Sequence, residues 1–427
     1  MHDARFSTTQ PWHVTTLGDV VVKGDLDIEI GARFSSSQMT ENESGEPVIM
    51  PENIRNHKIS PDGIARVRPD AVSNAGRFRV RRGDIVCSRR GDLTRYALVD
   101  SHCEGWLCGN GCLRLRFRSE ALDPRFAFYY FRQPWVATWL KSRAVGSTIP
   151  HINRRAIAKM PLSIPPYHEQ RDIADLLGVI EQKLEQNSAL RTDMLELARL
   201  YLQRSLKGIS PMQVEDAMRP DTLPDGFRLG TLSDCCRRIE IGGTPGDEYD
   251  VEKDATIPWL VSEEVRNGII ISAKKHLTRS TLVTAGLKLW PRGTTIVALF
   301  GAPAGSAAWL DVDASANQAC CGLVPADDFC AFNFLYLSSI GARLKQMRQG
   351  SKQQNLNKKL LEELTVLIPP HSMLRKIESE VRPLLEQMAA ISWQSTSLAI
   401  LRDAFLPQLV MGRWRFNQNK SHKSQHK

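Results

Sequence analysis

The chain of 427 residues contains an internal repeat. When the sequence is moved along itself by 204 positions, residues 146–208 fall on residues 350–412 without a gap. A repeat of this length means that one structural unit is present in two copies, and it constrains the fold more than any local pattern does. The identical positions include Gly146/Gly350, Ser147/Ser351, Asn153/Asn357, Ile164/Ile368, Pro165/Pro369, Pro166/Pro370, Leu202/Leu406 and Gly208/Gly412.

Each copy begins with a globular stretch, at 12–165 and at 227–369. Short apolar runs broken by Gly, Pro and Asn predict strands at 84–88, 113–117, 257–261 and 295–300. Helical patterns at 125–140 and 332–347 follow them, so both stretches are predicted to be mixed α/β. Pro-Pro closes each stretch, because a residue before proline avoids the α region.

A long helix is predicted after each Pro-Pro pair. The apolar residues repeat at a 4–3 spacing, which is typical of two helices packed on each other. The alternative is two separate amphipathic helices, each lying on its own globular unit. Gly208 and Gly412 are expected to end the first and the second helix. In the second helix, Pro383 is expected to cause a kink or to delay the start of the regular part, and Pro407 is expected to make the end fray early. The predicted helix seam consists of Ile173, Leu177, Ile180, Leu184, Ile377, Val381, Leu384 and Met388.

The predicted fold class is α/β (mixed α+β), with two globular domains in pseudo-two-fold arrangement joined by a pair of long antiparallel coiled-coil-like helices. A helix of roughly 35 residues is about 50 Å long, which suits two DNA half-sites about one helical turn apart. The predicted parts are a first domain at 1–165, a central helix at 166–208, a linker at 209–226, a second domain at 227–369, a distal helix at 370–412 and a disordered tail at 413–427.

Composition favours a polyanionic partner in the cytoplasm. The formal net charge is +9, and the N-terminus has no signal-peptide pattern. The nine cysteines are an odd number and suit a reducing compartment. Cys103, Cys108 and Cys112 cluster without a zinc-knuckle spacing, so we expect buried thiols and no metal.

Candidate DNA contacts are arginines, lysines and Gly-Ser turns. Arg77, Arg79 and Arg81 alternate and would share one face of a strand, whereas Arg114, Arg116 and Arg118 fit the solvated face of another. Ordinary surface arginines and structural turns remain the alternatives. The candidates are Arg77, Arg79, Arg81, Arg89, Arg90, Arg95, Ser147, Thr148, Lys274, Lys275, Arg279, Lys288, Ser351, Lys352 and Gln353.

No motif supports catalysis by this chain. Pro165-Pro166-Tyr167 follows Ile164, an apolar residue that cannot hold an adenine amino group as the polar residue of an adenine methyltransferase motif does. The stretch 301–305 lacks the Lys-Ser/Thr pair of a phosphate-binding loop and is expected to be a hairpin turn. The acidic run at 247–254 is expected to be solvated surface.

The chain resembles the specificity subunits of type I restriction–modification systems over nearly its whole length. The resemblance rests on Ile241-Gly242-Gly243-Thr244-Pro245, Leu289 through Thr294, the Gly-Ser turns and the Pro-Pro-x-x-Glu-Gln helix entry at 165–170. In the second copy Met373-Leu374 replaces Glu-Gln, so the resemblance implies no role for that pair there.

The resemblance implies a non-catalytic subunit with two target-recognition domains that read a bipartite, asymmetric target in double-stranded DNA. It also implies that the helices dock two methyltransferase subunits, with restriction/translocase subunits joining outside, and that S-adenosylmethionine, ATP and magnesium belong to those partners. Two alternatives stay open: a recognition subunit, or half, of another restriction or methylation enzyme with catalysis in trans, and a scaffold that does not bind DNA.

Overall fold

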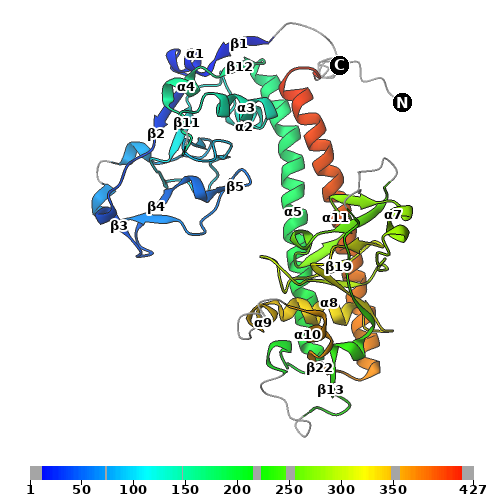
Figure 1. The fold of residues 1–427 in the computed structure, drawn as a ribbon. Coiled ribbons are helices and arrows are strands. Elements are labelled where there is room, and N and C mark those ends of the chain that lie inside the picture. Colours follow the sequence, from blue (N-terminus) through cyan, green and yellow to red (C-terminus); the bar gives the residue numbers. More distant parts are fainter. Residues whose placement is uncertain are drawn as a thin grey trace, which may run out of the picture. The chain divides into compact units, whose positions relative to one another are not determined.

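The computed structural model describes residues 12–72, 75–146, 148–214, 223–246, 255–347 and 356–415. Its contacts divide the chain into two compact units. Unit 1 comprises Met1–Gln182 and Ala399–Lys427, and unit 2 comprises Lys183–Leu398. Two long helices, α5 (Tyr167–Ser205) and α11 (His371–Val410), pass from one unit into the other (Figure 1).

The α/β domain of unit 1 consists of two four-stranded sheets and two short two-stranded ribbons. The sheet orders are β2-β11-β8-β9 and β10-β4-β7-β3, and the ribbons pair β1 with β12 and β5 with β6. The strands are β1 (His13–Thr16), β2 (Leu26–Ile30), β3 (Met39–Thr40), β4 (Glu46–Ile49), β5 (Ile54–Arg55), β6 (Lys58–Ile59), β7 (Ala65–Val67), β8 (Ile85–Ser88), β9 (Tyr96–Leu98), β10 (Leu107–Cys108), β11 (Cys112–Phe117) and β12 (Pro161–Ile164). The short helices are α1 (Leu17–Val22), α2 (Pro124–Phe131), α3 (Pro134–Ser142) and α4 (Arg154–Ala158).

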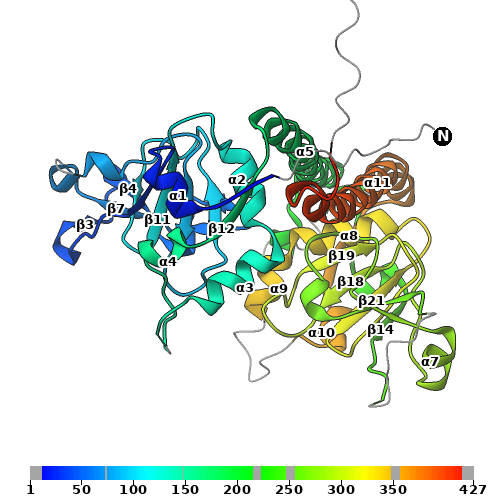
Figure 2. The same ribbon diagram turned by 90° about the horizontal axis from the view of Figure 1, so that it is seen from above.

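The α/β domain of unit 2 has a related topology, with five strands in its larger sheet and three in its smaller one. The sheet orders are β14-β21-β18-β19-β16 and β17-β15-β20, and the ribbon pairs β13 with β22. The strands are β13 (Arg228–Thr231), β14 (Cys236–Ile241), β15 (Ile257–Leu260), β16 (Gly268–Ile270), β17 (Lys275–Leu277), β18 (Thr295–Ala298), β19 (Ala307–Leu310), β20 (Ser315–Ala316), β21 (Cys320–Pro325) and β22 (Thr365–Ile368). The helices are α7 (Arg279–Thr284), α8 (Cys330–Ser339), α9 (Gly341–Met347) and α10 (Lys358–Glu362). Figure 2 shows α8 between the larger sheet and α11.

Residues that the two copies share have the same local role in each. Asn153 and Asn357 are the N-caps of α4 and α10, where their side chains accept from Ala156 N–H and Leu360 N–H. Gly31 and Gly242 lie where a Cβ would come within 2.1 Å and 2.3 Å of backbone oxygens. Glycine is therefore required at both sites, because only a residue without a side chain fits against the neighbouring loop.

The predicted fold class is confirmed, with differences in its helices. Two helices replace the single one expected at 125–140, because Pro134 starts a new helix at its first position. A break at Ile340 also divides 332–347. The chain at 301–305 joins antiparallel β18 and β19, as expected of a hairpin turn.

Both long helices end within three residues before the predicted stops Gly208 and Gly412, but neither the delayed start expected from Pro383 nor the early fraying expected at Pro407 is found. Gly208 and Gly412 adopt φ of +81° and +67° just beyond α5 and α11. The helix α11 starts at His371 and continues to Val410, so Pro383 does not delay its start and Pro407 does not end it. The tail prediction falls largely on residues 416–427, which lie outside the described residues.

The long helices pack on each other as well as on their domains. In unit 1, Ile173 and Leu177 share one core with Leu406 and Leu409 of α11 and with residues of the domain. In unit 2 the corresponding core contains side chains of both long helices, together with Leu206 just beyond the end of α5. Its helical members are Met194, Leu195, Ala198 and Leu202 of α5 and Ile377, Val381, Leu385, Met388 and Ala389 of α11. The same side chains thus serve the domain core and the helix pair.

Candidate nucleic-acid interface

Two loops that the sequence singled out separately lie side by side in unit 1. One follows β8 and contains Arg89 and Arg90, and the other is the hairpin 145–151 with the Gly-Ser turn. Ile152 N–H donates to Arg89 O at 3.0 Å, and Gly91 N–H donates to Pro150 O at 2.9 Å. The two segments therefore form one surface, which we call the unit 1 loop pair.

The arginines of the loop pair differ in their surroundings. Arg89 is half-buried, its Nη1 donates to Asn110 O at 3.1 Å, and its buried Nε has no hydrogen-bond partner among the described residues. Burial lowers the pKa of the Arg89 guanidinium, and the charge of Arg90 lowers it further. Arg90 is exposed and pairs with no carboxylate in the described part of the chain. The exposed, unneutralised charge of Arg90 favours the binding of a polyanion at this surface.

The hairpin of the loop pair exposes polar and apolar groups together. Thr148 is exposed, and so are Val145 and Ile149, at 59% and 62%. Exposed aliphatic side chains beside arginines suit a DNA groove, where thymine methyl groups accept apolar contacts. Ser147 lies outside the described residues, and so do Ser351, Lys352 and Gln353 of the second Gly-Ser turn.

Arg77, Arg79 and Arg81 do not share the face of a strand, which corrects the expectation from their alternation. The segment Gly76–Phe78 is a 3-10 turn. Arg77 lies 3.6 Å from Glu29, and Arg79 forms a 3.0 Å ion pair with Glu46. The hydrogen bond between Arg79 and Glu46 raises the pKa of the arginine and lowers that of the carboxyl. These two charges are therefore partly neutralised, which weakens the case for them as DNA contacts.

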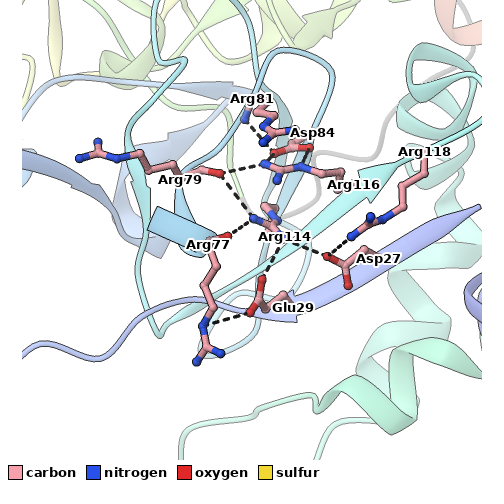
Figure 3. Close-up of polar contacts among 9 residues, drawn as sticks. All are labelled: Asp27, Glu29, Arg77, Arg79, Arg81, Asp84, Arg114, Arg116 and Arg118. Carbon is pink, nitrogen blue, oxygen red and sulfur yellow. Dashed lines mark hydrogen bonds and ion pairs between the residues drawn. The ribbon is translucent and has the colours of Figure 1, made fainter. Parts of the chain in front are cut away.

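Arg114 is buried, which corrects the prediction that its strand face is solvated. Its side chain is 3% exposed, and Nη2 lies 3.0 Å from Asp27 and 2.8 Å from Glu29 (Figure 3). Its Nη1 donates to the carbonyl oxygen of Arg77. Arg114 thereby joins β2 and β11 to the turn that carries Arg77.

Arg116 continues this buried network. It pairs with Asp84 at 2.6 Å, and its Nη2 also donates to Arg79 O at 2.8 Å (Figure 3). The hydrogen bond with Asp84 raises the pKa of Arg116. The sequence carries a signal for this network, since Asp27 and Glu29 alternate in β2 opposite Arg116 and Arg114 of β11. When acidic residues alternate on one strand and basic residues alternate on its neighbour, the two sets are expected to form ion pairs across the strands.

The other basic candidates are exposed and mostly lack acidic partners. Arg95 is the exception, since it pairs with Asp92 at 3.3 Å and donates to Pro51 O. In unit 2, Lys275 lies over the ring of Trp259 at 5.7 Å. No carboxylate pairs, within the described ranges, with the exposed side chains of Arg81, Lys274, Lys275, Arg279 and Lys288.

The predicted helix seam is apolar at its ends and polar at one level. Ile173, Leu177, Ile180, Ile377, Val381 and Met388 are buried, whereas Leu184 and Leu384 are half-buried and Leu385 is fully buried. Asn187, 1% exposed, donates to Gln394 Oε1 at 2.9 Å and to Ser395 Oγ at 3.1 Å. Arg191 donates to Ser392 Oγ at 2.9 Å. A polar level of this kind fixes the register of a helix pair.

The helix entries are docked to their domains by side chains of the long helices. In unit 1 the buried Gln170 accepts from Asp123 N–H at 2.7 Å, at the start of α2. In unit 2, where Leu374 replaces that glutamine, Glu378 accepts from Ala331 N–H at 2.8 Å near the start of α8. In unit 2 the docking hydrogen bond is therefore made by a residue one helical turn further along α11 than the position equivalent to Gln170. This helix entry does not need the Glu-Gln pair of the first copy.

The described residues contain no cluster of three or more His, Cys, Asp or Glu that could hold a metal ion. The nine cysteines are free. Burial raises the pKa of Cys103 to about 11, and a side-chain hydrogen bond with Cys108, together with burial, raises the pKa of Cys112. The thiols of Cys103 and Cys112 are therefore protonated at neutral pH. The acidic run at 247–254 lies outside the described residues. None of the described helices is long and apolar enough to span a bilayer.

Two α/β domains, each followed by a long helix, make this a duplicated two-domain protein with a pair of connecting helices. The chain belongs to the family described as the type I restriction modification DNA specificity domain, which matches residues 9–192 and 224–379. It is thus a specificity subunit of a type I restriction–modification system, a non-catalytic subunit that recognises DNA, and cofactors belong to the other subunits of such systems.

The chain is similar to two specificity subunits along their full length. It is 23% identical to the type I restriction enzyme MjaIX specificity subunit of Methanocaldococcus jannaschii, over 97% of this chain and 98% of that one. It is 20% identical to the HindI specificity subunit of Haemophilus influenzae, over 91% and 98%. A type I S subunit from M. genitalium has a similar fold, with a TM-score of 0.60 and 17% identity over 95% and 97% of the two chains.

Proposed function

We propose that each α/β domain reads one part of a bipartite, asymmetric target in double-stranded DNA. The observation that carries the proposal is the unit 1 loop pair, in which Arg89 and Arg90 and the hairpin 145–151 form one surface. Two domains of one topology present different residues at their loops, which suits two different half-sites read by one scaffold. Arginine pairs best with guanine in the major groove, so we expect guanine in the part that unit 1 reads.

We further propose that the paired helices dock two methyltransferase subunits. Leu190, Leu197 and Leu200 of α5 are 47%, 56% and 55% exposed, and Trp393 of α11 is 45% exposed. Exposed apolar side chains in this number indicate a protein-binding surface. Repeated helices would offer each copy of the same partner an equivalent surface. Restriction/translocase subunits would join through those partners, which would hold S-adenosylmethionine, ATP and magnesium, in the cytoplasm where the DNA lies.

DNA binding is tested with the full chain and a duplex that contains its target. Replacement of Arg89 and Arg90 by alanine should weaken binding at each salt concentration and make the salt dependence shallower, because each lost phosphate contact lowers the slope by about 0.9. The matched control replaces Arg237 and Arg238, an adjacent exposed pair already bound to Asp327 and Glu240. Methyltransferase docking should survive in both double variants.

Two results would reject parts of this proposal. A wild-type chain that shows no salt-dependent binding to DNA would be a scaffold and not a DNA reader. Unchanged DNA affinity in the Arg89/Arg90 double variant would remove the loop pair from the interface, while leaving other candidates such as Arg279 and Lys288 in place.

A further inference from the structure

The loop that follows β8 in unit 1 has a structural equivalent after β18 in unit 2. Arg89 N–H donates to Gly111 O at 2.9 Å, and Leu299 N–H donates to Ala319 O at 2.8 Å. These bonds extend the same antiparallel ladders, β8 with β11 and β18 with β21. Leu299 therefore occupies the place of Arg89, although the two residues have no chemical similarity that a sequence comparison could use.

The next residues of the two loops also correspond. Gly91 and Gly301 have φ of +73° and +79°, so both chains turn at the same point through the left-handed region. Phe300 thus stands where unit 1 has Arg90. It is a large apolar side chain that remains 36% exposed at a loop tip. Burial is the usual place for phenylalanine, so an exposed ring here suits contact with a ligand.

A second pair of residues corresponds at the neighbouring turn. Within the turn 109–112 the last N–H donates to the first carbonyl at 2.9 Å, and within 317–320 the same bond measures 3.0 Å. Both turns enter an inner strand of their sheet, β11 or β21. Gln318 therefore occupies the place of Asn110, the residue whose carbonyl binds Arg89 in unit 1.

The Gln318 side chain is held in position at the surface. Thr244 Oγ1 donates to Gln318 Oε1, and both residues are exposed. The hydroxyl holds the carboxamide by its oxygen, so the Nε2–H groups remain available as donors. A preorganised amide loses less conformational entropy when it binds a base edge than a free side chain does.

We infer that Phe300 and Gln318 contact bases in the part of the target that unit 2 reads. This inference rests on the proposed function. Glutamine pairs with adenine at N6 and N7, and an apolar ring can contact a thymine methyl group. The unit 2 half-site should therefore contain an A·T pair, in contrast to the guanine expected for unit 1. Lys274, Lys275, Arg279 and Lys288 remain candidates for phosphate contacts, which carry affinity but no base preference.

The test uses the complex assembled with its methyltransferase partners and a library of randomised duplexes. The variants are Phe300→Ala and Gln318→Ala, with Arg90→Ala to identify the half-site of unit 1. Each unit 2 variant should relax base preference at one or two positions of the other half-site by about 5- to 150-fold. Lys288→Ala is the matched control and should lower affinity for all duplexes alike. Gln318→Ala should leave the melting temperature unchanged, because Gln318 is exposed, whereas Phe300→Ala should lower it slightly, because the ring is 36% exposed and otherwise packed.

The outcomes separate this inference from the function on which it rests. If the wild type selects a two-part target and both unit 2 variants keep that target unchanged, Phe300 and Gln318 do not read bases and the inference fails alone. If Phe300→Ala or Gln318→Ala relaxes the half-site that Arg90→Ala also relaxes, the assignment to unit 2 is wrong. If the wild type selects no sequence, the proposed function itself fails.

Discussion

The buried carboxamide of Asn187 on α5 donates a 2.9 Å hydrogen bond to Oε1 of Gln394 on α11. The two residues are 207 positions apart, and they lie between apolar levels of the helix pair. An apolar level at this point would allow the helices to slide by a turn at little cost, because leucines pack on one another in several registers. The amide bond requires one register.

Asn187→Ala should therefore destabilise unit 2 by about 0.5–1.5 kcal/mol, because it removes the hydrogen bonds to Gln394, which is exposed, and Ser395, which is half-buried. Chemical denaturation measures the loss, and Gln186→Ala, at an exposed neighbouring position, is the control. Asn187→Ala combined with Gln394→Ala should cost less than the two single losses added together. Strict additivity would show that the bond contributes nothing.

Arg114→Met should destabilise unit 1 by about 3–5 kcal/mol. The substitution leaves Asp27 and Glu29 without their 3.0 Å and 2.8 Å partner in a protected site. Arg118→Met is the matched control, since Arg118 is 60% exposed and lies 3.6 Å from the same Asp27. It should cost less than about 1 kcal/mol. Equal free energies of unfolding for the two variants would contradict a structural role for the buried arginine.

Leu177→Asp should lower the melting temperature sharply, because an unpaired carboxylate would enter the core shared by α5, α11 and the domain of unit 1. Val179→Asp, two positions away and 64% exposed in the wild type, should leave the melting temperature nearly unchanged. Leu385→Asp is the corresponding test in unit 2, where Leu385 is fully buried. Equal melting temperatures for Leu177→Asp and Val179→Asp would mean that this face of α5 is not packed.

His57 should make unit 1 less stable in mild acid. Its ring lies 4.6 Å from that of Tyr96, and burial lowers its pKa below 6.5, with the nearby Arg132 charge acting in the same direction. The folded state therefore binds the proton less readily than the unfolded chain. The contribution of the neutral His57 to the free energy of unfolding is fully present above pH 6.5. It falls as the pH drops from there toward the lower pKa of the folded state.

The variant His57→Phe keeps an aromatic ring against Tyr96 and removes the titration. The free energy of unfolding, measured between pH 7.5 and pH 5, should decline less in this variant than in the wild type. Parallel declines in the two proteins would exclude His57 as a source of the pH dependence.

The repeat, the strands at the cores and the long helices could be predicted from the sequence because their signals are local or periodic. The positions of Asn153 and Asn357, of the Pro-Pro pairs and of the terminal glycines each reflect a requirement that the neighbouring backbone imposes. Whether a given arginine is exposed or buried in an ion pair could not be predicted from the sequence. The alternation of Arg114 and Arg116 fits a solvated face as well as a buried one, and only the carboxylates on β2 and Asp84 distinguish the two.

From its sequence alone the chain could be divided into two copies of a mixed α/β domain, each followed by a long helix, and placed among DNA specificity subunits. The three-dimensional fold was needed to find which basic residues are already neutralised, and that Phe300 and Gln318 stand where unit 1 has Arg90 and Asn110. Periodicity and capping act over a few neighbouring residues, whereas ion pairs and loop correspondence depend on segments that are distant in the chain, such as Arg116 and Asp84, 32 positions apart.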